Sequence, residues 1–400
     1  MNLTFQRIID RILGTLICMS LSLIPRREGF TKVYPKKILV ILLSEMGSLV
    51  LAHPMFIEIK KRYPDATLYV LLFKQNREIL EILNVLSNEN IMSIDNTSIK
   101  RFVLDCLQIL RKLRRIEFDA VIDCELFSRI SSIFSFLSGA SLRVGFHPYT
   151  QEGLYRGSFI NRPVMYNPYN HISEQFLTMV KALDSNTVPT AKRFVSSRLR
   201  EAPSISFQET EIHGMTNRLH RDFPVLKDKE LILLYPSGGI LPIRAWPLDY
   251  YCRLSKRFLS DGYAVVIIGT EADKTLAETI QDKCGSFHCI DLTGYTKNLR
   301  EMMILFHRAS LLITNDGGPG QFAALTSIPT IIFYGPETPV LYGTLNRKAV
   351  FFYLSLSCSP CLTAYNHRNS PCDGDNLCLK KIQPDQVYKK ALEILRSENN

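Results

Sequence analysis

Hydrophobic positions in the first half of the chain alternate between short apolar runs and amphipathic stretches. Apolar runs at residues 38–43, 67–72 and 118–125, and the run "RVGF", predict strands. A tight turn at Met46-Gly47-Ser48 is followed by a predicted helix to Arg62, and residues 98–115 have helical spacing. Continuous apolar strands that alternate with helices are typical of a parallel sheet covered on both faces.

The same alternation returns in the second half. Strands are predicted in "LILLYPSGG", "YAVVIIGT", "CIDLTG", "LLITNDGGPG" and "PTIIFYGPE", with helices at 248–260, from 274, and at 299–308. Polar residues and prolines interrupt the pattern between 185 and 229. We therefore predict an N-terminal α/β domain at 31–200 and a C-terminal one at 201–400, each doubly wound.

The N-terminal segment, residues 1–30, predicts an amphipathic helix. Apolar residues recur at helical spacing, whereas Gln6, Arg7, Asp10 and Arg11 fall on the other face. The weakly polar run at 12–24 is shorter than the roughly 20 residues that span a bilayer. We expect it to lie on a membrane surface, where nearby cations would sit beside anionic headgroups: Arg26, Arg27, Lys32, Lys36 and Lys37. A helix docked on the protein's own core and a signal peptide are the alternatives.

Composition and charge indicate which class of molecule the protein binds. The 400 residues include 46% hydrophobic and 22% charged residues, and the formal charge is +10, so an anionic partner is expected. No nucleic-acid-binding module is recognisable, and we predict no nucleic-acid partner. Six of the ten cysteines are scattered through the chain, which favours a reducing compartment.

Small residues dominate the turns that follow the strands of the second half. These turns are "YPSGG", "GTEAD", "DLTG" and "NDGGPG". Glycine lets a ligand approach the backbone closely, and a helix beginning at Gln321 would direct N–H groups at an anion such as a diphosphate. Any one of these turns could merely connect strand to helix. A dinucleotide-binding dehydrogenase and a P-loop protein are not supported, because neither glycine pattern is present.

Together these segments carry a family resemblance. "KILVILLSEMGSLVLAHPMFIEIKKRYPDA", "YPSGGILPIRAWPLDYYCRLSKRFLSDGYAVVIIGTEAD", "DLTG", "NDGGPGQFAALTSIPTIIFYGPETP" and "CSPC" resemble, in order, the blocks of glycosyltransferase family nine, the ADP-heptose:lipopolysaccharide heptosyltransferases. The resemblance covers roughly residues 36–382. It implies a GT-B fold: two Rossmann-like doubly wound domains facing across a cleft, with the donor on the C-terminal domain and the acceptor on the N-terminal one.

The resemblance also implies donor-binding positions. The phosphate-binding turn of the family falls on Asp316, Gly317, Gly318 and Pro319, and Arg244 stands near the place of its usual lysine. A guanidinium can grip a diphosphate bidentately. Further candidates for substrate binding are Gly47, Ser237, Gly238 and Glu271, with Asp273 as the alternative acid for a ribose hydroxyl. Charge on the leaving diphosphate would then be neutralised without a metal cofactor.

One position departs from the family. Its members usually have Gly-Asp in the first turn, and this aspartate is the expected general base, but here the pair is Gly47-Ser48. A serine hydroxyl cannot take a proton at neutral pH without help. We predict that Glu45 or Glu125 substitutes, with Ser48 in the same loop and His53 as a weaker candidate. The chain could instead bind nucleotide-sugar donors without catalysing transfer of the sugar.

Two further segments carry candidate chemistry. The long segment 145–176, with His147, Arg156, Arg162 and His171, is expected to hold the acceptor, against irregular packing. Near the C-terminus, at 358–378, four cysteines have the spacing C-x2-C-x10-C-x5-C, which could hold a structural zinc ion, form disulfides or remain reduced thiols: Cys358, Cys361, Cys372 and Cys378.

The sequence therefore predicts a glycosyltransferase that moves a heptose-like sugar from a nucleotide-diphosphate donor to a surface glycolipid or glycan, with inversion. We expect it in the cytoplasm, peripheral on the inner face of the cytoplasmic membrane. The alternative is a sugar-nucleotide-binding protein that has lost catalysis.

Overall fold

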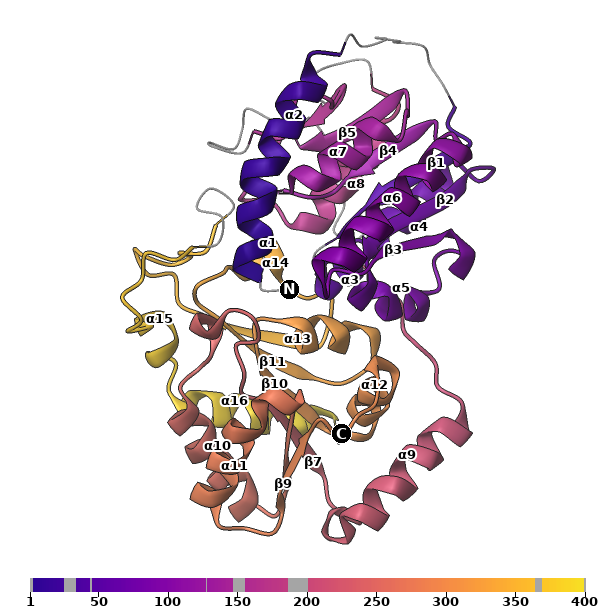
Figure 1. Cartoon of the computed structure of the whole chain (residues 1–400). Helices are drawn as coiled ribbons and strands as arrows, with labels where there is room; N and C mark the ends of the chain where they lie inside the picture. Colours follow the sequence, from indigo (N-terminus) through magenta and orange to yellow (C-terminus); the bar gives the residue numbers. More distant parts are fainter. Residues whose placement is uncertain are drawn as a thin grey trace. The chain divides into compact units, whose positions relative to one another are not determined.

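The structure, a computed structural model, describes residues 3–24, 34–43, 45–126, 128–146, 155–185, 201–363 and 369–398 (Figure 1). Contacts divide the chain into two compact units, residues 1–201 and 202–400. Each unit is built on its own sheet.

Six parallel strands form the sheet of unit 1, in the order β3-β2-β1-β4-β5-β6. The strands are β1 (Lys37–Ile41), β2 (Thr67–Phe73), β3 (Ile91–Ile94), β4 (Ala120–Asp123), β5 (Leu142–Phe146) and β6 (Arg162–Val164). The predicted strands correspond to β1, β2, β4 and β5, whereas β3 and β6 were not predicted. Both faces of the sheet are buried, which explains why the strands are continuously apolar.

Helices cover both faces of this sheet. They are α3 (Met46–Leu51), α4 (His53–Arg62), α5 (Arg77–Leu83), α6 (Ile99–Ile116), α7 (Arg129–Leu137) and α8 (Ile172–Ala182). The prediction of a single helix up to Arg62 was wrong: α3 ends at Leu51, Ala52 separates it from α4, and α4 has Pro54 in its first turn. Proline has no N–H to continue the hydrogen bonds of the preceding turn, so a new helix begins there.

Unit 2 repeats the design, with strand order β12-β11-β10-β7-β8-β9, all parallel. Its strands are β7 (Leu231–Tyr235), β8 (Ala264–Gly269), β9 (Cys289–Thr293), β10 (Leu311–Asn315), β11 (Thr330–Tyr334) and β12 (Ala349–Tyr353). Its helices are α9 (Glu209–Asp222), α10 (Leu248–Ser260), α11 (Lys274–Cys284), α12 (Leu299–Arg308), α13 (Gly318–Phe322), α14 (Pro339–Tyr342), α15 (Leu377–Lys380) and α16 (Pro384–Glu398).

Two helices of unit 2 differ from expectation. The helix expected to begin at Gln321 is α13, a single turn that begins at Gly318 and already contains Pro319. In the stretch where the pattern weakens, α9 forms with only Met215 and Leu219 buried, so its sequence shows little apolar periodicity. A capping box between Gln208 and Glu211 stabilises its first turn.

The N-terminal helix is nearly continuous: α1 (Leu3–Ile9), a π-helical turn (Asp10–Gly14) and α2 (Thr15–Ser22). Two residues of the predicted polar face, Gln6 and Asp10, contact unit 1. Asp10 accepts hydrogen bonds from the backbone N–H groups of Arg129 and Ile130 at the start of α7, and Gln6 accepts one from Asn96. Among the described residues, no helix has the length and apolar character needed to cross a bilayer.

A buried ion pair joins β4 to the segment before β6. Asp123 is completely buried, and its carboxylate accepts hydrogen bonds from the Arg156 guanidinium and from Ser131 Oγ at 3.1 Å. Burial raises the pKa of the Asp123 carboxyl, and the positive charge of Arg156 opposes that shift. Arg156 also donates to the carbonyl oxygens of Glu125 and Ser128. The pair therefore holds the loop after β4 in place.

Replacing Arg156 by methionine leaves the Asp123 carboxylate buried without its cation. We expect the free energy of unfolding to fall by about 3–5 kcal/mol, measured by urea denaturation. The matched control is Arg253→Met, since Arg253 pairs with Asp249 on an exposed surface, and its effect should stay within about 0.5 kcal/mol. Equal effects of the two substitutions would contradict a structural role for the buried pair.

Candidate active site

A single buried amide organises the strand ends of unit 2. Asn315, completely buried at the end of β10, donates from Nδ2 to the carbonyl oxygens of Pro236 and Ser237, both at 3.0 Å. Its Oδ1 accepts from the Trp246 backbone N–H at 2.9 Å and from the Tyr251 hydroxyl at 3.2 Å. Asn315 therefore ties the loop after β7, and the chain that carries Arg244, to the glycine-rich turn.

The Arg244 side chain lies between two carboxylates. Its Nε is 3.4 Å from Asp316 Oδ2, and its Nη2 is 3.2 Å from Glu337 Oε1. The side chains of Arg244, Asp316 and Glu337 are only 13%, 9% and 2% exposed. Burial raises the pKa of the adjacent Tyr334, so its hydroxyl stays neutral. The structure thus brings two predicted residues together with Glu337, which the sequence analysis missed.

The glycine-rich turn runs closely beside the sheet. Gly317 is extended, with φ of 169°. A Cβ on Gly320 would lie 2.9 Å from Ile332 Cδ1, and one on Gly318 would lie 3.1 Å from the Phe322 ring. Pro319, in the first turn of α13, contributes no N–H group. A larger residue at position 320 would have to displace the buried end of the Ile332 side chain in β11, so the turn packs tightly here.

The loop after β7 is also tightly packed. Ser237 is buried, and its Oγ accepts a hydrogen bond from the Gly239 N–H at 3.0 Å. A Cβ on Gly238 would lie 2.7 Å from the Leu241 carbonyl oxygen. This backbone therefore folds back on itself just before Arg244.

The two acids predicted to hold a ribose hydroxyl differ in surroundings. Asp273 Oδ2 accepts hydrogen bonds from Thr270 N and Thr270 Oγ1, both at 2.8 Å, so Asp273 caps its own turn. Glu271 is exposed and approaches Gly294, whose φ of +69° favours glycine. Of the two, Glu271 is the better placed to meet a ligand.

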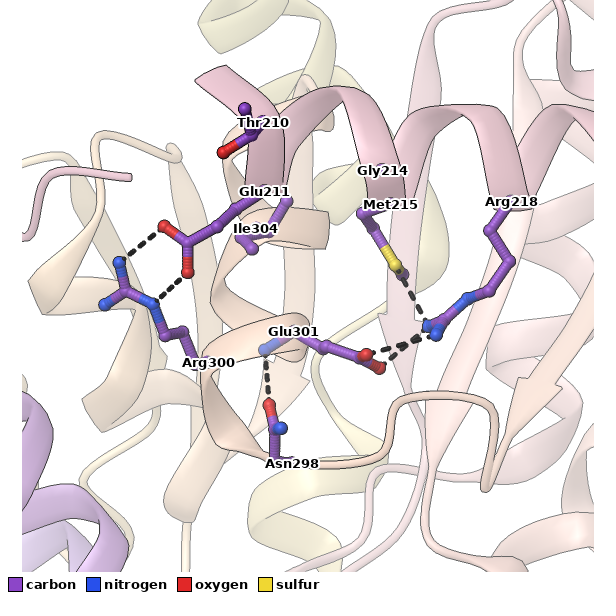
Figure 2. A pocket seen from close by; sticks show the side chains of 9 residues that line it. All are labelled: Thr210, Glu211, Gly214, Met215, Arg218, Asn298, Arg300, Glu301 and Ile304. Carbon is purple, nitrogen blue, oxygen red and sulfur yellow. Dashed lines mark hydrogen bonds and ion pairs between the residues drawn. The ribbon is translucent and has the colours of Figure 1, made fainter. Parts of the chain in front are cut away.

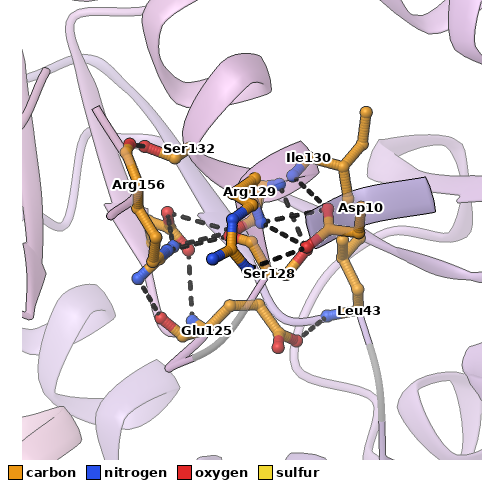
Figure 3. A network of polar contacts seen from close by, with 10 residues as sticks. Asp10, Leu43, Glu125, Ser128, Arg129, Ile130, Ser132 and Arg156 are labelled. Carbon is orange, nitrogen blue, oxygen red and sulfur yellow. Dashed lines mark hydrogen bonds and ion pairs between the residues drawn. The ribbon is translucent and has the colours of Figure 1, made fainter. Parts of the chain in front are cut away.

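In unit 1, the candidate bases Glu45 and Glu125 lie after the neighbouring strands β1 and β4, and Figure 3 shows Glu125 with Leu43. Glu125 follows β4, is buried, and accepts a hydrogen bond on Oε1 from the Leu43 N–H at 2.7 Å. Glu45 is half-buried at the start of α3, and its Oε2 accepts from Ser48 Oγ at 3.4 Å. Gly47 lies between Glu45 and Ser48 in the sequence, in the first turn of α3. Glu125 is thus committed to the end of β1, whereas Glu45 and Ser48 form a local pair.

Other predicted residues of unit 1 have structural partners. His53 Nδ1 lies 3.3 Å from the Glu201 carbonyl oxygen, and burial lowers its pKa. Arg156 pairs with Asp123, Arg162 is buried in β6, and His171 Nδ1 accepts from the Ser173 N–H at the start of α8. All three side chains are buried, and the expectation that the segment 145–176 holds the acceptor stays a prediction. Arg26, Arg27, Lys32 and His147 lie outside the described residues.

The four C-terminal cysteines are free thiols. Cys358 and Cys372 are exposed, whereas Cys378 is buried beside Gly335 and burial raises its pKa to about 11. Ser370 Oγ donates to Cys361 Sγ at 3.0 Å. Within the part of the chain that the structure describes, no three Cys, His, Asp or Glu side chains converge on a metal position. The donor set does not fit zinc as placed, and the zinc site stays a prediction of the sequence.

A pocket of about 310 Å³ lies between α9 and α12 (Figure 2). Its charged side chains are already paired: Glu211 with Arg300 at 2.6 Å, and Arg218 with Glu301 at 2.7 Å. The Arg300 guanidinium holds the pKa of Glu211 down at about 2. These pairs join the two helices, and none of the predicted site residues lines the pocket.

Comparisons with known proteins agree on one family. The model of glycosyltransferase family 9 (heptosyltransferase) matches residues 106–370. Lipopolysaccharide heptosyltransferase 2 of Salmonella typhimurium is 24% identical over 368 residues, covering 90% of this chain and 99% of the relative. The ADP-heptose LPS heptosyltransferase II structure of E. coli has a TM-score of 0.71 at 21% identity, covering 91% and 100% of the two chains.

A family 9 glycosyltransferase structure from Veillonella parvula has a TM-score of 0.66 at 19% identity, covering 90% of this chain and 97% of that one. These likenesses confirm the predicted α/β, GT-B fold class. The family model matches more than half of the residues of this chain. The chain therefore belongs to glycosyltransferase family 9 and is a glycosyltransferase.

Proposed function

We propose that this glycosyltransferase transfers a heptose from an ADP-heptose-like donor to a lipopolysaccharide-type acceptor, with inversion, at the cytoplasmic side of the membrane. The relative from Salmonella typhimurium and the solved E. coli protein are both heptosyltransferases of lipopolysaccharide, which supports this donor and acceptor class. The observation that carries the proposal is the buried cluster of Arg244, Asp316 and Glu337 beside the glycine-rich turn.

The donor diphosphate would bind at this cluster. Arg244 is the buried cation beside the turn, and Asn315 fixes the two backbone segments that flank it. Asp316 and Glu337 hold the guanidinium in position but offset its charge. A diphosphate would have to replace part of these contacts, so Glu337 weakens donor binding while it orients the arginine. The exposed Glu271 would accept from a ribose hydroxyl.

We assign the general base to Glu45. Its carboxylate is half-buried and adjoins Ser48, which occupies the position of the usual family aspartate. The buried Glu125 accepts from Leu43 N–H at the end of β1, so it would position the loop rather than take the acceptor proton. The developing charge on the leaving diphosphate would be stabilised by Arg244 and backbone N–H groups, with no metal ion required.

Ser48 also supports a second function, a sugar-nucleotide-binding protein without transferase turnover. A single-turnover assay with labelled ADP-heptose and a deacylated lipopolysaccharide-core acceptor separates the two. We expect labelled acceptor to form at a rate that EDTA does not change. If calorimetry detects donor binding but no labelled acceptor forms, the second function is favoured. If no donor binding is detected, both functions are contradicted.

Arg244→Ala should weaken ADP binding by about tenfold to a hundredfold, because a charge-assisted bidentate contact is lost. Glu337→Gln should tighten it severalfold, because the guanidinium is released from one carboxylate. Titration calorimetry measures both, with Arg253→Ala at an exposed position of α10 as the matched control. Unchanged affinity in Arg244→Ala would contradict the assignment.

Glu45→Gln should lower kcat by about 10²–10⁴-fold with little change in donor affinity, because only proton transfer is removed. Glu125→Gln should instead lower the melting temperature, since its buried hydrogen bond to Leu43 is weakened. Single-turnover rates and thermal unfolding of the two variants give the comparison. A large loss of rate in Glu125→Gln with intact stability and full activity in Glu45→Gln would reverse the two roles.

Thiol labelling at pH 8 tests the cysteine cluster. In the reduced, metal-free protein, exposed Cys358 and Cys372 should react first, whereas Cys378 should react last because its pKa of about 11 leaves little thiolate. Mass spectrometry of the labelled peptides gives the order. Joint protection of all four cysteines, lifted by a chelator, would instead support the predicted structural metal.

A further inference from the structure

The N-terminal helix packs on unit 1 with its small and polar residues and leaves apolar residues outside. Asp10, Gly14 and Cys18 face the protein: Asp10 binds the start of α7, Gly14 meets Arg129, and Cys18 packs with Ile133 and Phe159. The outward residues are at least 36% exposed: Ile8, Ile12, Leu13, Leu16, Ile17, Met19, Leu23 and Ile24.

Polar contacts fix the rotation of this helix. The Asp10 carboxylate accepts from the Arg129 and Ile130 N–H groups at 2.9–3.1 Å, which satisfies orphan donors at the start of α7. Thr15 Oγ1 accepts from Arg129 Nε at 2.9 Å. Turning the apolar face inward would break these bonds and move the Asp10 carboxylate away from the start of α7. The outward apolar face is therefore the stable arrangement of the docked helix.

A second helix presents a similar surface. α6 buries Ile109 and Leu113 against the sheet, yet Ile99, Val103 and Leu107, spaced four residues apart, are 52%, 48% and 48% exposed. Leu104 beside them is 49% exposed. Six cations also lie on its exposed positions: Lys100, Arg101, Arg111, Lys112, Arg114 and Arg115. The single acid of α6, Asp105, is half-buried and accepts from the Asp95 N–H.

Both helices lie on the same side of unit 1. The crossovers from β3 to β4 and from β4 to β5 run in the same direction across the sheet, so right-handed connection places α6 and α7 on one face. The N-terminal helix and α6 each pack against α7, which has no exposed residue of its own. Asn96, just before α6, donates to Gln6 near the start of the N-terminal helix.

We propose that these two helices form one docking surface for an anionic phospholipid bilayer. The occupant follows from the combination of exposed aliphatic side chains with a positive rim that includes Arg7 and Arg11 of the N-terminal helix. Aliphatic residues enter the boundary between headgroups and acyl chains, while Lys and Arg attract anionic headgroups. The surface extends the proposed function, since a lipid-borne acceptor lies in such a bilayer.

Vesicle flotation of the full-length protein tests the surface. Vesicles of phosphatidylcholine and phosphatidylglycerol at 3:1 should carry most of the protein, and pure phosphatidylcholine much less. Ile12→Ser/Leu16→Ser and Val103→Ser/Leu107→Ser should each weaken partitioning about tenfold, through lost apolar burial. Arg111→Gln/Arg114→Gln should weaken binding to the anionic vesicles alone. Phe287→Ser, at a 71% exposed position in unit 2, is the matched control.

Unchanged partitioning in the α6 apolar variant would overturn the two-helix surface. A dimer in light scattering that the same variants dissociate would also overturn it, by assigning the surface to a second copy. Transfer to a deacylated acceptor should be the same in all of these variants, so that loss of vesicle binding with intact transfer separates this proposal from the proposed function.

Discussion

Parallel pairing of the strands is the constraint on which both units depend. A parallel neighbour can be reached only by a crossover, and in most of the described connections a helix follows the strand and covers one face of the sheet. The carboxyl ends of all strands then meet at one edge of the sheet, where backbone N–H and C=O groups no longer pair between strands. In unit 2 this edge carries Ser237, Glu271 and Asp316, and in unit 1 it carries Glu45 and Glu125. The candidate chemistry is therefore a consequence of the topology.

Hydrogen bonds to buried side chains give these edges a defined shape. The Asn315 side-chain amide accepts a hydrogen bond from the Trp246 N–H and donates one to the Ser237 carbonyl oxygen. Glu125 joins the ends of β1 and β4 by accepting from the Leu43 N–H. Such contacts are made before any ligand arrives. The backbone that would surround the nucleotide-sugar donor therefore need not become ordered when the donor binds. In this protein the residues that shape the site are more deeply buried than those that would contact substrate.

Sequence periodicity was sufficient for most strands and for helices such as α12, because strands buried on both faces and helices with one apolar face have distinct patterns. It missed β3 and β6, which are only four and three residues long. It failed for α9, whose exposed surface leaves little periodicity, and for the break at Ala52. Glu337 was missed because its pairing with Arg244 joins residues on different loops, which spacing along the chain does not reveal. The buried state of Arg156, which pairs with Asp123 in β4, was missed for the same reason.

The Asp10 contact has a consequence for biosynthesis. Its partner residues lie 119 and 120 positions later in the chain, so the N-terminal helix leaves the ribosome well before α7 exists to receive it. During that interval the Asp10 carboxylate lacks its hydrogen-bond donors at the start of α7. Translation thus orders the events: the aliphatic stripe is available to lipid first, and the folding of unit 1 afterwards locks the carboxylate onto its helix terminus.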